Sequence, residues 1–446
     1  MGARAGPYQL GPAVDLVAFY LLLPFLLLLA LGVPIAFSIS LACALFLLFS
    51  GTRIPTTVLA SEMYGAVDSF TLLALPTFVL AGELLNRCEL TDKLIEFCQR
   101  LVGWIRGGLA HVTVTASMLL SGITGSTLSD AATIAPIMIP SMIKEKYPRE
   151  FAGALVASAS VIGAIIPPSI PLVIIGAQLG ISIGGLLVGG VLPGIVVGIT
   201  LMIASYVAAR LGGFGAIRRF EGFRPLARST WIALPVLVIP VLLLGGMMSG
   251  IFSPTEAGTV TVLYTIVAGM FFYRTLTVTK LVDSLKATAW VSASALIIVA
   301  AAVVLGRIMT FHRVPQALVE LMVAITQDKL ALLLLVILLF IIVGMFMDAV
   351  ANMVILGPLL YPLCVQVLGM HPIQYGMFLM VGLLLGVLTP PVGLVLFIVA
   401  PIARLTLERI SLAVLPYLAL EFVILFVIAT VPELTLALPR LAGYVT

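Results

Sequence analysis

Two stretches decide the fold, SGITGSTLSDAATIAPIMIP at residues 121–140 and VGMFMDAVANMVILGPLLYP at residues 343–362. Gly122, Pro136 and Pro140 of the first coincide with Gly344, Pro358 and Pro362 of the second at an offset of 222 positions. A second pair follows, GAIIPPSIP at 163–171 and GVLTPPVGL at 386–394, at an offset of 223. Matching Gly and Pro interruptions inside apolar segments of two halves are typical of secondary transporters and indicate where the binding site lies.

The composition predicts a polytopic membrane protein. Apolar residues make up 62% of the chain and charged residues 9%, whereas soluble domains carry about 25% charged residues. The four cysteines lack metal-ligand spacing, which favours reduced, packed thiols. No removable signal peptide is expected, and nucleic-acid binding is excluded. Neither a phosphate-binding Gly-rich loop with Lys nor an HExxH metalloprotease motif is present, so the sequence predicts no enzyme, and energy must come from an ion gradient.

Ten membrane crossings are predicted from apolar stretches of about 17 residues or more, the shortest length that spans a bilayer. They lie at 14–31, 34–50, 70–86, 151–183, 184–209, 230–250, 255–273, 289–306, 373–403 and 409–431. Two of these, 151–183 and 373–403, carry a Pro-Pro pair and are predicted to be broken helices. Two other stretches, 109–142 and 330–364, are predicted re-entrant hairpins, because each is too long for one crossing and too short for two.

The basic residues support this topology. With both chain ends outside, 17 of the 23 Lys and Arg fall in inner loops, as the positive-inside rule requires. Each half then holds an odd number of crossings, so the second half is inserted upside down. The predicted fold is all-α and polytopic, an inverted repeat of two five-crossing halves, each with a re-entrant hairpin and a broken helix.

The interruptions also predict a binding site. Broken helices free backbone carbonyls for a hard cation, and half-helix N-termini attract an anion. Hydroxyl groups at the first hairpin tip would act as further ligands. So would residues at the tip of the second hairpin and in the helix break that faces it. These residues are Ser121, Thr124, Ser126 and Thr127 in the first half, and Gly344, Asp348 and Thr389 in the second. The alternative is that Gly and Pro merely kink packed helices.

Two carboxylates follow the hairpin tips. Asp130 and Asp348 are either functional intramembrane acids or acids that cap their half-helices. They do not coincide under the repeat offset, since Asp348 matches Ser126 and Asp130 matches Asn352. No Arg or Lys occurs near the breaks, so helix N-termini and hydroxyls would have to hold an anionic substrate.

The chain resembles the large membrane subunit of TRAP transporters, the DctM type. The motifs that carry the resemblance are AGELLNR (81–87), IRGGLAHV (105–112), SGITGS with the following Asp130, GAIIPPSIP, GMFMDA…ILGPLLYP and GVLTPPVGL. They occur in order over nearly the whole chain. The resemblance implies a sodium-coupled importer of organic acids in a bacterial or archaeal inner membrane. It also implies a periplasmic binding protein and a separate small four-helix membrane subunit as partners, with no cofactor beyond Na⁺.

The resemblance further implies two sodium sites. One would use Ser121 and Thr124 with carbonyls of Gly163, Ile166 and Pro168. The other would lie near Gly344 and Phe346 with Gly386, Thr389 and Pro391. Substrate contacts are expected at Ser126, Thr127 and Asp348. The alternative function is a stand-alone sodium- or proton-coupled anion transporter of the same superfamily, working without a binding protein.

An elevator-type division into scaffold and transport parts is implied as well. The expected boundaries are residues 1–108 for scaffold helices with an inner amphipathic arm, 109–210 for the first transport half, 211–229 for a cytoplasmic linker, 230–328 for a second scaffold segment and 329–446 for the second transport half.

Overall fold

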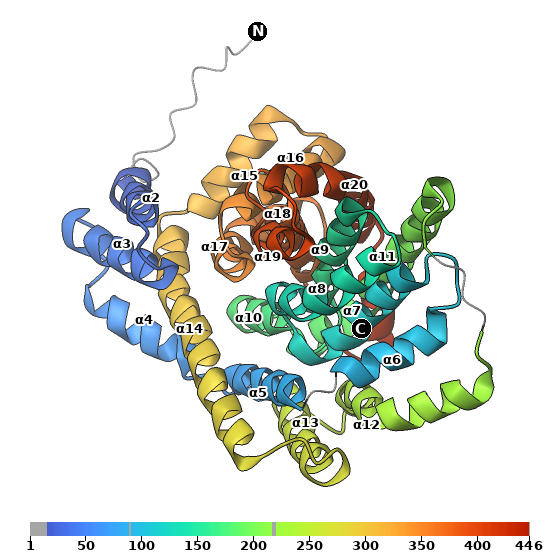
Figure 1. Ribbon diagram of the computed structural model, residues 1–446. Coiled ribbons are helices and arrows are strands. Elements are labelled where there is room, and N and C mark those ends of the chain that lie inside the picture. The colour runs from blue at the N-terminus through green and yellow to red at the C-terminus, as the bar shows by residue number, and fades with distance from the viewer. Residues whose placement is uncertain (1–15, 89–90, 216–219, 446) are drawn as a thin grey trace. The chain divides into compact units, whose positions relative to one another are not determined.

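Every regular element in the part of the chain that the structure describes is a helix (Figure 1). This structure is a computed structural model, and it describes residues 16–88, 91–215 and 220–445. Within these ranges the side chains of Ala18, Asp92 and residues 121–124 lie outside the description. The all-α prediction is therefore confirmed.

The helices follow the Gly and Pro punctuation of the sequence. Along the chain they are η1 (Ala18–Leu22), α2 (Leu23–Ala30), α3 (Ile35–Phe49), α4 (Thr57–Val67), η2 (Phe70–Leu73), α5 (Ala74–Arg87), α6 (Thr91–Val102), α7 (Gly108–Thr124), α8 (Thr127–Lys144), α9 (Arg149–Ile165), α10 (Ile170–Leu179), α11 (Ile183–Gly212), α12 (Phe223–Met248), α13 (Pro254–Val267), η3 (Ala268–Phe272), α14 (Val278–Phe311), α15 (Val314–Ile325), α16 (Lys329–Phe346), α17 (Ala349–Tyr361), η4 (Pro362–Val367), α18 (Pro372–Leu388), α19 (Leu394–Ala403), α20 (Leu407–Thr430) and α21 (Glu433–Leu441).

The helices are those of a multi-pass membrane protein. Among the described residues, seven helices are long and apolar enough to cross a bilayer, or up to nine if each bent pair is one span. The predicted breaks at both Pro-Pro pairs and at both hairpin tips are interruptions between helices. Ten crossings, the inverted orientation of the halves and the sidedness of the chain ends stay predictions.

Some helices were not predicted from the sequence. α4, α15 and α21 occupy stretches that were expected to be loops or chain ends, and each is only 9 to 12 residues long. α12 begins at Phe223, inside the stretch expected to be the linker. A search for apolar stretches of membrane-spanning length misses such helices, because their own apolar runs are short.

The chain packs into two compact units. Unit 1 comprises residues 1–69, 293–336 and 354–369, and unit 2 comprises 70–292, 337–353 and 370–446. These two units are defined by packing, and their boundaries differ from those expected from the sequence. The expected boundaries separate a scaffold from a moving transport part, and that division stays a prediction.

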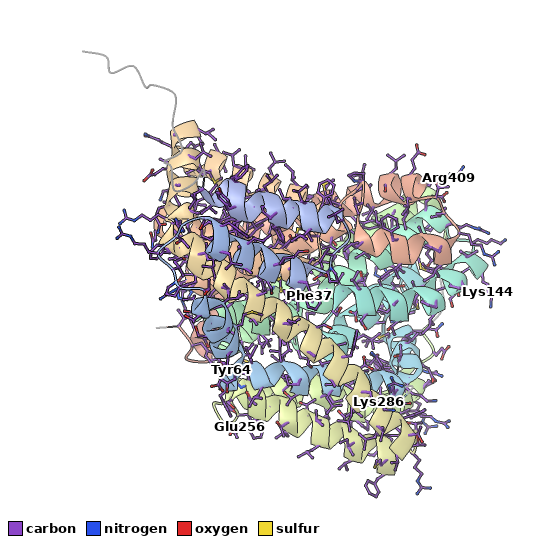
Figure 2. All side chains as sticks on the ribbon, turned by 90° about the vertical axis from the view of Figure 1, so that its left-hand side faces the viewer. Phe37, Tyr64, Lys144, Glu256, Lys286 and Arg409 are labelled. Carbon is purple, nitrogen blue, oxygen red and sulfur yellow. The ribbon has the colours of Figure 1, made fainter. Side chains whose placement is uncertain are left out.

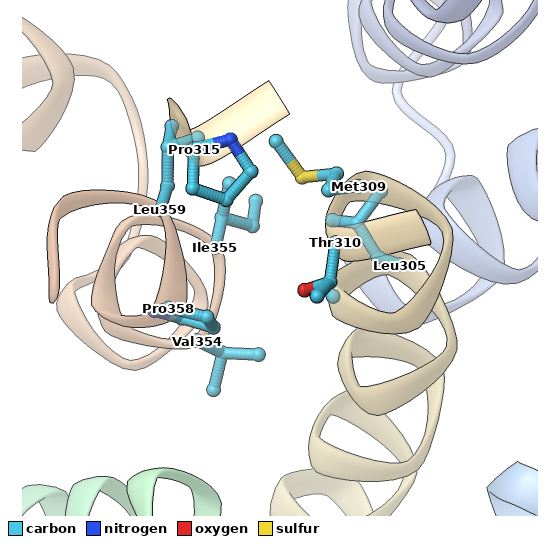
Figure 3. Close-up of a pocket in the computed structure, with 9 residues that line it drawn as sticks. Leu305, Met309, Thr310, Pro315, Val354, Ile355, Pro358 and Leu359 are labelled. Atoms are coloured by element: carbon cyan, nitrogen blue, oxygen red, sulfur yellow. The ribbon is translucent and has the colours of Figure 1, made fainter. Parts of the chain in front are cut away.

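Unit 1 contains α2, α3, α4 and α15 and parts of α14, α16 and α17. His312 joins its elements, because its ring packs edge-on against Phe46 at 5.2 Å between centroids. Arg307 and Glu62 approach to 3.7 Å. A pocket between α14 and α17 is lined almost wholly by apolar groups, with the Thr310 hydroxyl as an exception (Figure 3). Such a lining suits helix packing or a hydrocarbon chain, not an ion.

Two helices form the core of unit 2. α9 is buried along its whole length from Ala152 to Ile165, and α18 from Ile373 to Leu388. A helix that is buried on all sides lies in the centre of a bundle, packed by protein rather than by lipid. α9 and α18 pack against each other and against α11 and α20, and α8 and α19 also contact α9 (Figure 1). Both central helices end at the Pro-Pro breaks.

α6 is the predicted amphipathic arm. Leu94, Phe97 and Cys98 are buried and charged residues lie between them. Figure 2 shows Lys144, Lys286 and Arg409 on one side of unit 2 and Glu256 toward the other. The topology prediction requires this grouping of basic residues.

Candidate functional site

The two helix breaks have the same backbone geometry. The C-cap residue of α9, Ile166, has φ −78° and ψ 132°, and that of α18, Thr389, has φ −78° and ψ 130°. Each is followed by a Pro-Pro pair joined by a cis peptide bond. Proline removes the N–H that would continue the helix and favours extended backbone in the residue before it. The carbonyls of the preceding turn are thereby released from regular helical bonding.

Ser169 closes the first break, and it is a residue that the sequence analysis did not single out. Its hydroxyl donates to the Ala164 carbonyl at 2.5 Å and accepts from the Leu172 N–H at 3.4 Å. The side chain is fully buried. Its signal in the sequence was its place as an N-cap directly before Ile170 and Pro171. Ser169 thus holds the end of α9 and the start of α10 together.

The first hairpin tip lies directly on this break. Gly125 has a left-handed φ of 60°, and a Cβ there would stand 2.6 Å from the Pro168 carbonyl oxygen. The Ile170 N–H donates to the Gly125 carbonyl at 3.4 Å. Only glycine suits both the φ and the contact. The structure therefore brings the tip, Pro168 and the start of α10 together.

The candidate residues of the first tip are placed as follows. Ser121 and Thr124 belong to the last turn of α7, and their side chains lie outside the described residues. Ser126 is the N-cap of α8 in extended conformation. Thr127 is buried, and its hydroxyl has no hydrogen-bond partner among the described groups. Gly163, Ile166 and Pro168 are all buried.

Asp130 is fully buried one turn into α8. Its carboxyl group packs on Gly163 so closely that a Cβ on Gly163 would overlap the carboxylate oxygen. The glycine of the break therefore makes room for this acid. Sequence reasoning noticed both residues and could not foresee their contact.

The second tip is also packed on its break. A Cβ on Gly344 would stand 2.7 Å from the Gly386 Cα and 3.0 Å from the Leu383 carbonyl oxygen. The Thr389 hydroxyl donates to the Leu385 carbonyl at 2.7 Å. The Phe346 side chain is 64% exposed, so only its backbone could contribute to an ion site. Pro391 is exposed as well.

Asp348 acts as a cap for α17. Its carboxylate accepts from the Val350 N–H at 2.9 Å, as an N-cap acid does. Asn352, fully buried, donates its amide to the carbonyls of Val343 and Met347 at 3.2 and 3.1 Å. Asn352 stands four residues past Asp348, as Asp130 stands four past Ser126. Ser126 and Asp348 match in the sequence, and in the structure each stands directly before its helix, α8 or α17. Asn352 links the two arms of the second hairpin, α16 and α17, through its amide hydrogen bonds.

The arrangement offers backbone oxygens and helix N-termini rather than a cluster of side-chain ligands. Among the described residues, no three His, Cys, Asp or Glu lie close enough to hold a metal ion together. The starts of α8, α10, α17 and α19 carry the partial positive charge of helix N-termini. Backbone carbonyls and hydroxyls suit an alkali cation, and helix N-termini suit a carboxylate.

Comparison with known proteins gives consistent results. The family description "Tripartite ATP-independent periplasmic transporter, DctM component" matches residues 22–434. The sialic acid TRAP transporter large permease protein SiaM of Vibrio cholerae is 38% identical over 93% of this chain and 96% of its own length. The C4-dicarboxylate TRAP transporter large permease protein DctM of the same organism is 32% identical over 92% and 94%.

One solved structure shares the fold. The YdaH transporter of Alcanivorax borkumensis aligns with a TM-score of 0.58 over 87% of each chain, at 16% sequence identity. At that identity the likeness concerns the fold alone.

Proposed function

Because the chain belongs to the DctM family of TRAP transporters, we propose that it is the large membrane subunit that carries an organic acid inward with sodium ions. The observation that carries this proposal is the pairing of each hairpin tip with a helix break of the same geometry, Ile166 in one half and Thr389 in the other. Each pairing brings a backbone carbonyl against the hairpin tip, that of Pro168 against Gly125 and that of Leu383 against Gly344.

Sodium coupling is supported by the chemistry of these points. In the first half the proposed ligands are the Ser121 and Thr124 hydroxyls with carbonyls of Gly163, Ile166 and Pro168. The close contact of Gly125 with the Pro168 carbonyl supports this set, because it brings the hairpin tip against the helix break. In the second half the proposed ligands come from Gly344, Phe346, Gly386, Thr389 and Pro391. The backbone contact between Gly344 and Gly386 supports this set.

The substrate is proposed to bind through its carboxylate. Ser126 and Thr127 open α8, where the helix N-terminus attracts an anion. Thr127 keeps a buried hydroxyl that no described group engages. Asp348 borders the second tip, where its carboxylate already caps α17. Relatives whose names include sialic acid and C4-dicarboxylates support organic acids as the substrate class.

Membership of this family supports the proposal that the chain works in a larger assembly. We propose a small membrane subunit and a periplasmic binding protein as partners, and the bacterial inner membrane as the location, with both chain ends outside. The proposed cycle is of the elevator type, in which sodium binding closes the hairpin tips over the carboxylate before the mobile part moves.

The test is uptake into proteoliposomes that contain this chain, its small partner and the cognate binding protein. We expect accumulation only with an inward sodium gradient and with the binding protein. Accumulation that is unchanged without sodium would exclude sodium coupling. Accumulation with sodium but without the binding protein would instead identify a stand-alone transporter.

A further inference from the structure

A hollow lies between α6 and the first turns of α12. The hollow has a volume of about 640 Å³ and is lined by Glu96 and Arg100 of α6 and by Arg224, Pro225, Arg228, Ser229 and Ile232 of α12. Three of these seven residues are cations and one is an acid. The cavity is therefore positively charged, and it opens where the chain is predicted to return to the membrane from the inner side.

The three arginines are not equivalent. Arg100 already has two carboxylate partners, Glu96 at 3.1 Å and Glu221 at 2.6 Å. Arg224 and Arg228 have no ion pair among the residues that the structure describes. They stand four positions apart, so both guanidinium groups project from one face of α12. Two unpaired guanidinium groups side by side suit a phosphate, which arginine binds through paired hydrogen bonds.

An apolar groove continues along the same face. It has a volume of about 470 Å³ and is lined by Pro235, Tyr264, Val267, Ala268, Phe271 and Phe272. Arg224, Arg228, Ile232 and Pro235 follow one another at spacings of four, four and three residues, which is one stripe of a helix. Tyr273, next to the groove residue Phe272, donates its hydroxyl to the Ile232 carbonyl at 2.6 Å. Polar hollow and apolar groove therefore adjoin.

The dimensions match a phospholipid. Seven residues separate Arg228 from Pro235, a rise of about 10 Å along a helix. One leaflet contributes about half of the roughly 30 Å hydrocarbon core. Aromatic side chains that favour the interface flank the hollow, with Trp104 45% exposed and Trp231 67% exposed. The positive-inside rule explains the charge of this region, but it does not explain a charged hollow that adjoins an apolar groove.

We propose that α12 holds one anionic phospholipid, with Arg224 and Arg228 on its phosphate and the groove beyond Pro235 around an acyl chain. The occupant is a lipid rather than a soluble anion because the charged hollow and the apolar groove adjoin along one face of α12, and an anionic one because the lining is positively charged.

The test uses the purified, delipidated complex of the large and small subunits. Long-chain phosphatidylglycerol should raise its melting temperature by several degrees and should be retained in native mass spectrometry. In the double variant Arg224→Gln/Arg228→Gln, we expect the shift to be lost and retention to fall about tenfold. The control Lys144→Gln/Arg210→Gln removes two exposed basic residues elsewhere, and it should behave as wild type.

Three further arms decide the source of the effect. Phosphatidylcholine of the same chain length should give no comparable shift, and neither should inorganic phosphate or dihexanoyl phosphatidylglycerol. A shift with inorganic phosphate alone would make this a free-anion site and overturn the proposal. Equal retention by wild type and the double variant would also overturn it. Binding to the isolated large subunit but not to the complex would show that the small subunit occupies the groove, and would overturn it as well.

Discussion

Gly344 and Gly386 touch through their backbones. A Cβ on Gly344 would lie 2.7 Å from the Gly386 Cα, and a Cβ on Gly386 would lie 2.6 Å from the Gly344 Cα. No flexible side chain stands at either contact, so no rotamer change can make room. α16 can approach α18 this closely only because both positions are glycine.

Gly344→Ala should therefore destabilise the protein by about 1–3 kcal/mol, the usual range for overpacking a core, and should reduce uptake. Thermal unfolding of the detergent-purified protein measures the first effect. Gly245→Ala is the matched control, because this glycine lies inside α12 with nothing within 4 Å of an added Cβ. It should be neutral or slightly stabilising. Equal melting temperatures for Gly344→Ala and wild type would contradict the contact.

Gly163 and Asp130 should behave as a coupled pair. Gly163→Ala introduces a methyl group where the Asp130 carboxyl group lies, so we expect a marked loss of folded protein. Removing the carboxyl group in Asp130→Ala should restore part of it, because the two substitutions then share the same space. Folded yield and melting temperature of the two single variants and the double variant measure the coupling. Strictly additive effects would count against the packing described.

Thr389→Ala should weaken sodium dependence more than stability. Among the described groups, the Thr389 hydroxyl bonds only to the Leu385 carbonyl one turn back, a bond worth about 1 kcal/mol. Because the Thr389 hydroxyl is a proposed sodium ligand, its loss should raise the sodium concentration that gives half-maximal uptake about tenfold. Thr261→Ala is matched, since Thr261 is also buried and bonded to the carbonyl one turn back, in α13. If both variants keep wild-type sodium dependence, Thr389 does not bind the ion.

Glu421→Met should stabilise unit 2. Glu421 is 1% exposed on α20, and neither carboxyl oxygen has a hydrogen-bond partner among the described groups. Unsatisfied buried polar groups cost about 1–3 kcal/mol, so an apolar side chain of similar length should raise the melting temperature. Gln374→Met should lower the melting temperature, because the Gln374 amide donates to the carbonyls of Ile428 and Ala429 at 3.0 Å each. A lower melting temperature for Glu421→Met would show that its carboxyl group has a structural partner.

His371 should make stability depend on pH. Its Nδ1 accepts from the Ile373 N–H at 3.2 Å in the loop before α18, which requires the neutral ring. Burial, and then the charge of Arg440, lower the pKa of His371 below its usual 6.5. The stability that His371 contributes is thus present above pH 6.5 and lost as the pH falls through the folded-state pKa. His371→Asn keeps a capping oxygen that does not titrate, so its melting temperature should fall less between pH 7.5 and 5.5. An unchanged slope would exclude His371 as the cause.

The sequence predicts most of the helix breaks and little of what holds them. Gly and Pro decide helix ends locally, so the ends of α9 and α18 could be read directly. The bond from Ser169 to Ala164, the contact of Asp130 with Gly163 and the amide bridge of Asn352 depend on how helices pack. A single amino-acid sequence, read by itself, carries no signal for such contacts. The short helices were missed because they do not span a bilayer.

The matching breaks also imply an order of events. Ile166 and Thr389 occupy the same backbone position, but only Thr389 has a hydroxyl. At the hairpins the distribution is reversed, since Ser121 and Thr124 correspond to Val343 and Phe346. Under the proposed coupling, opening the first hairpin takes away the side-chain oxygens of its ion, whereas the second ion keeps its hydroxyl on the broken helix. The first site would therefore empty before the second, so the two ions leave in a fixed sequence.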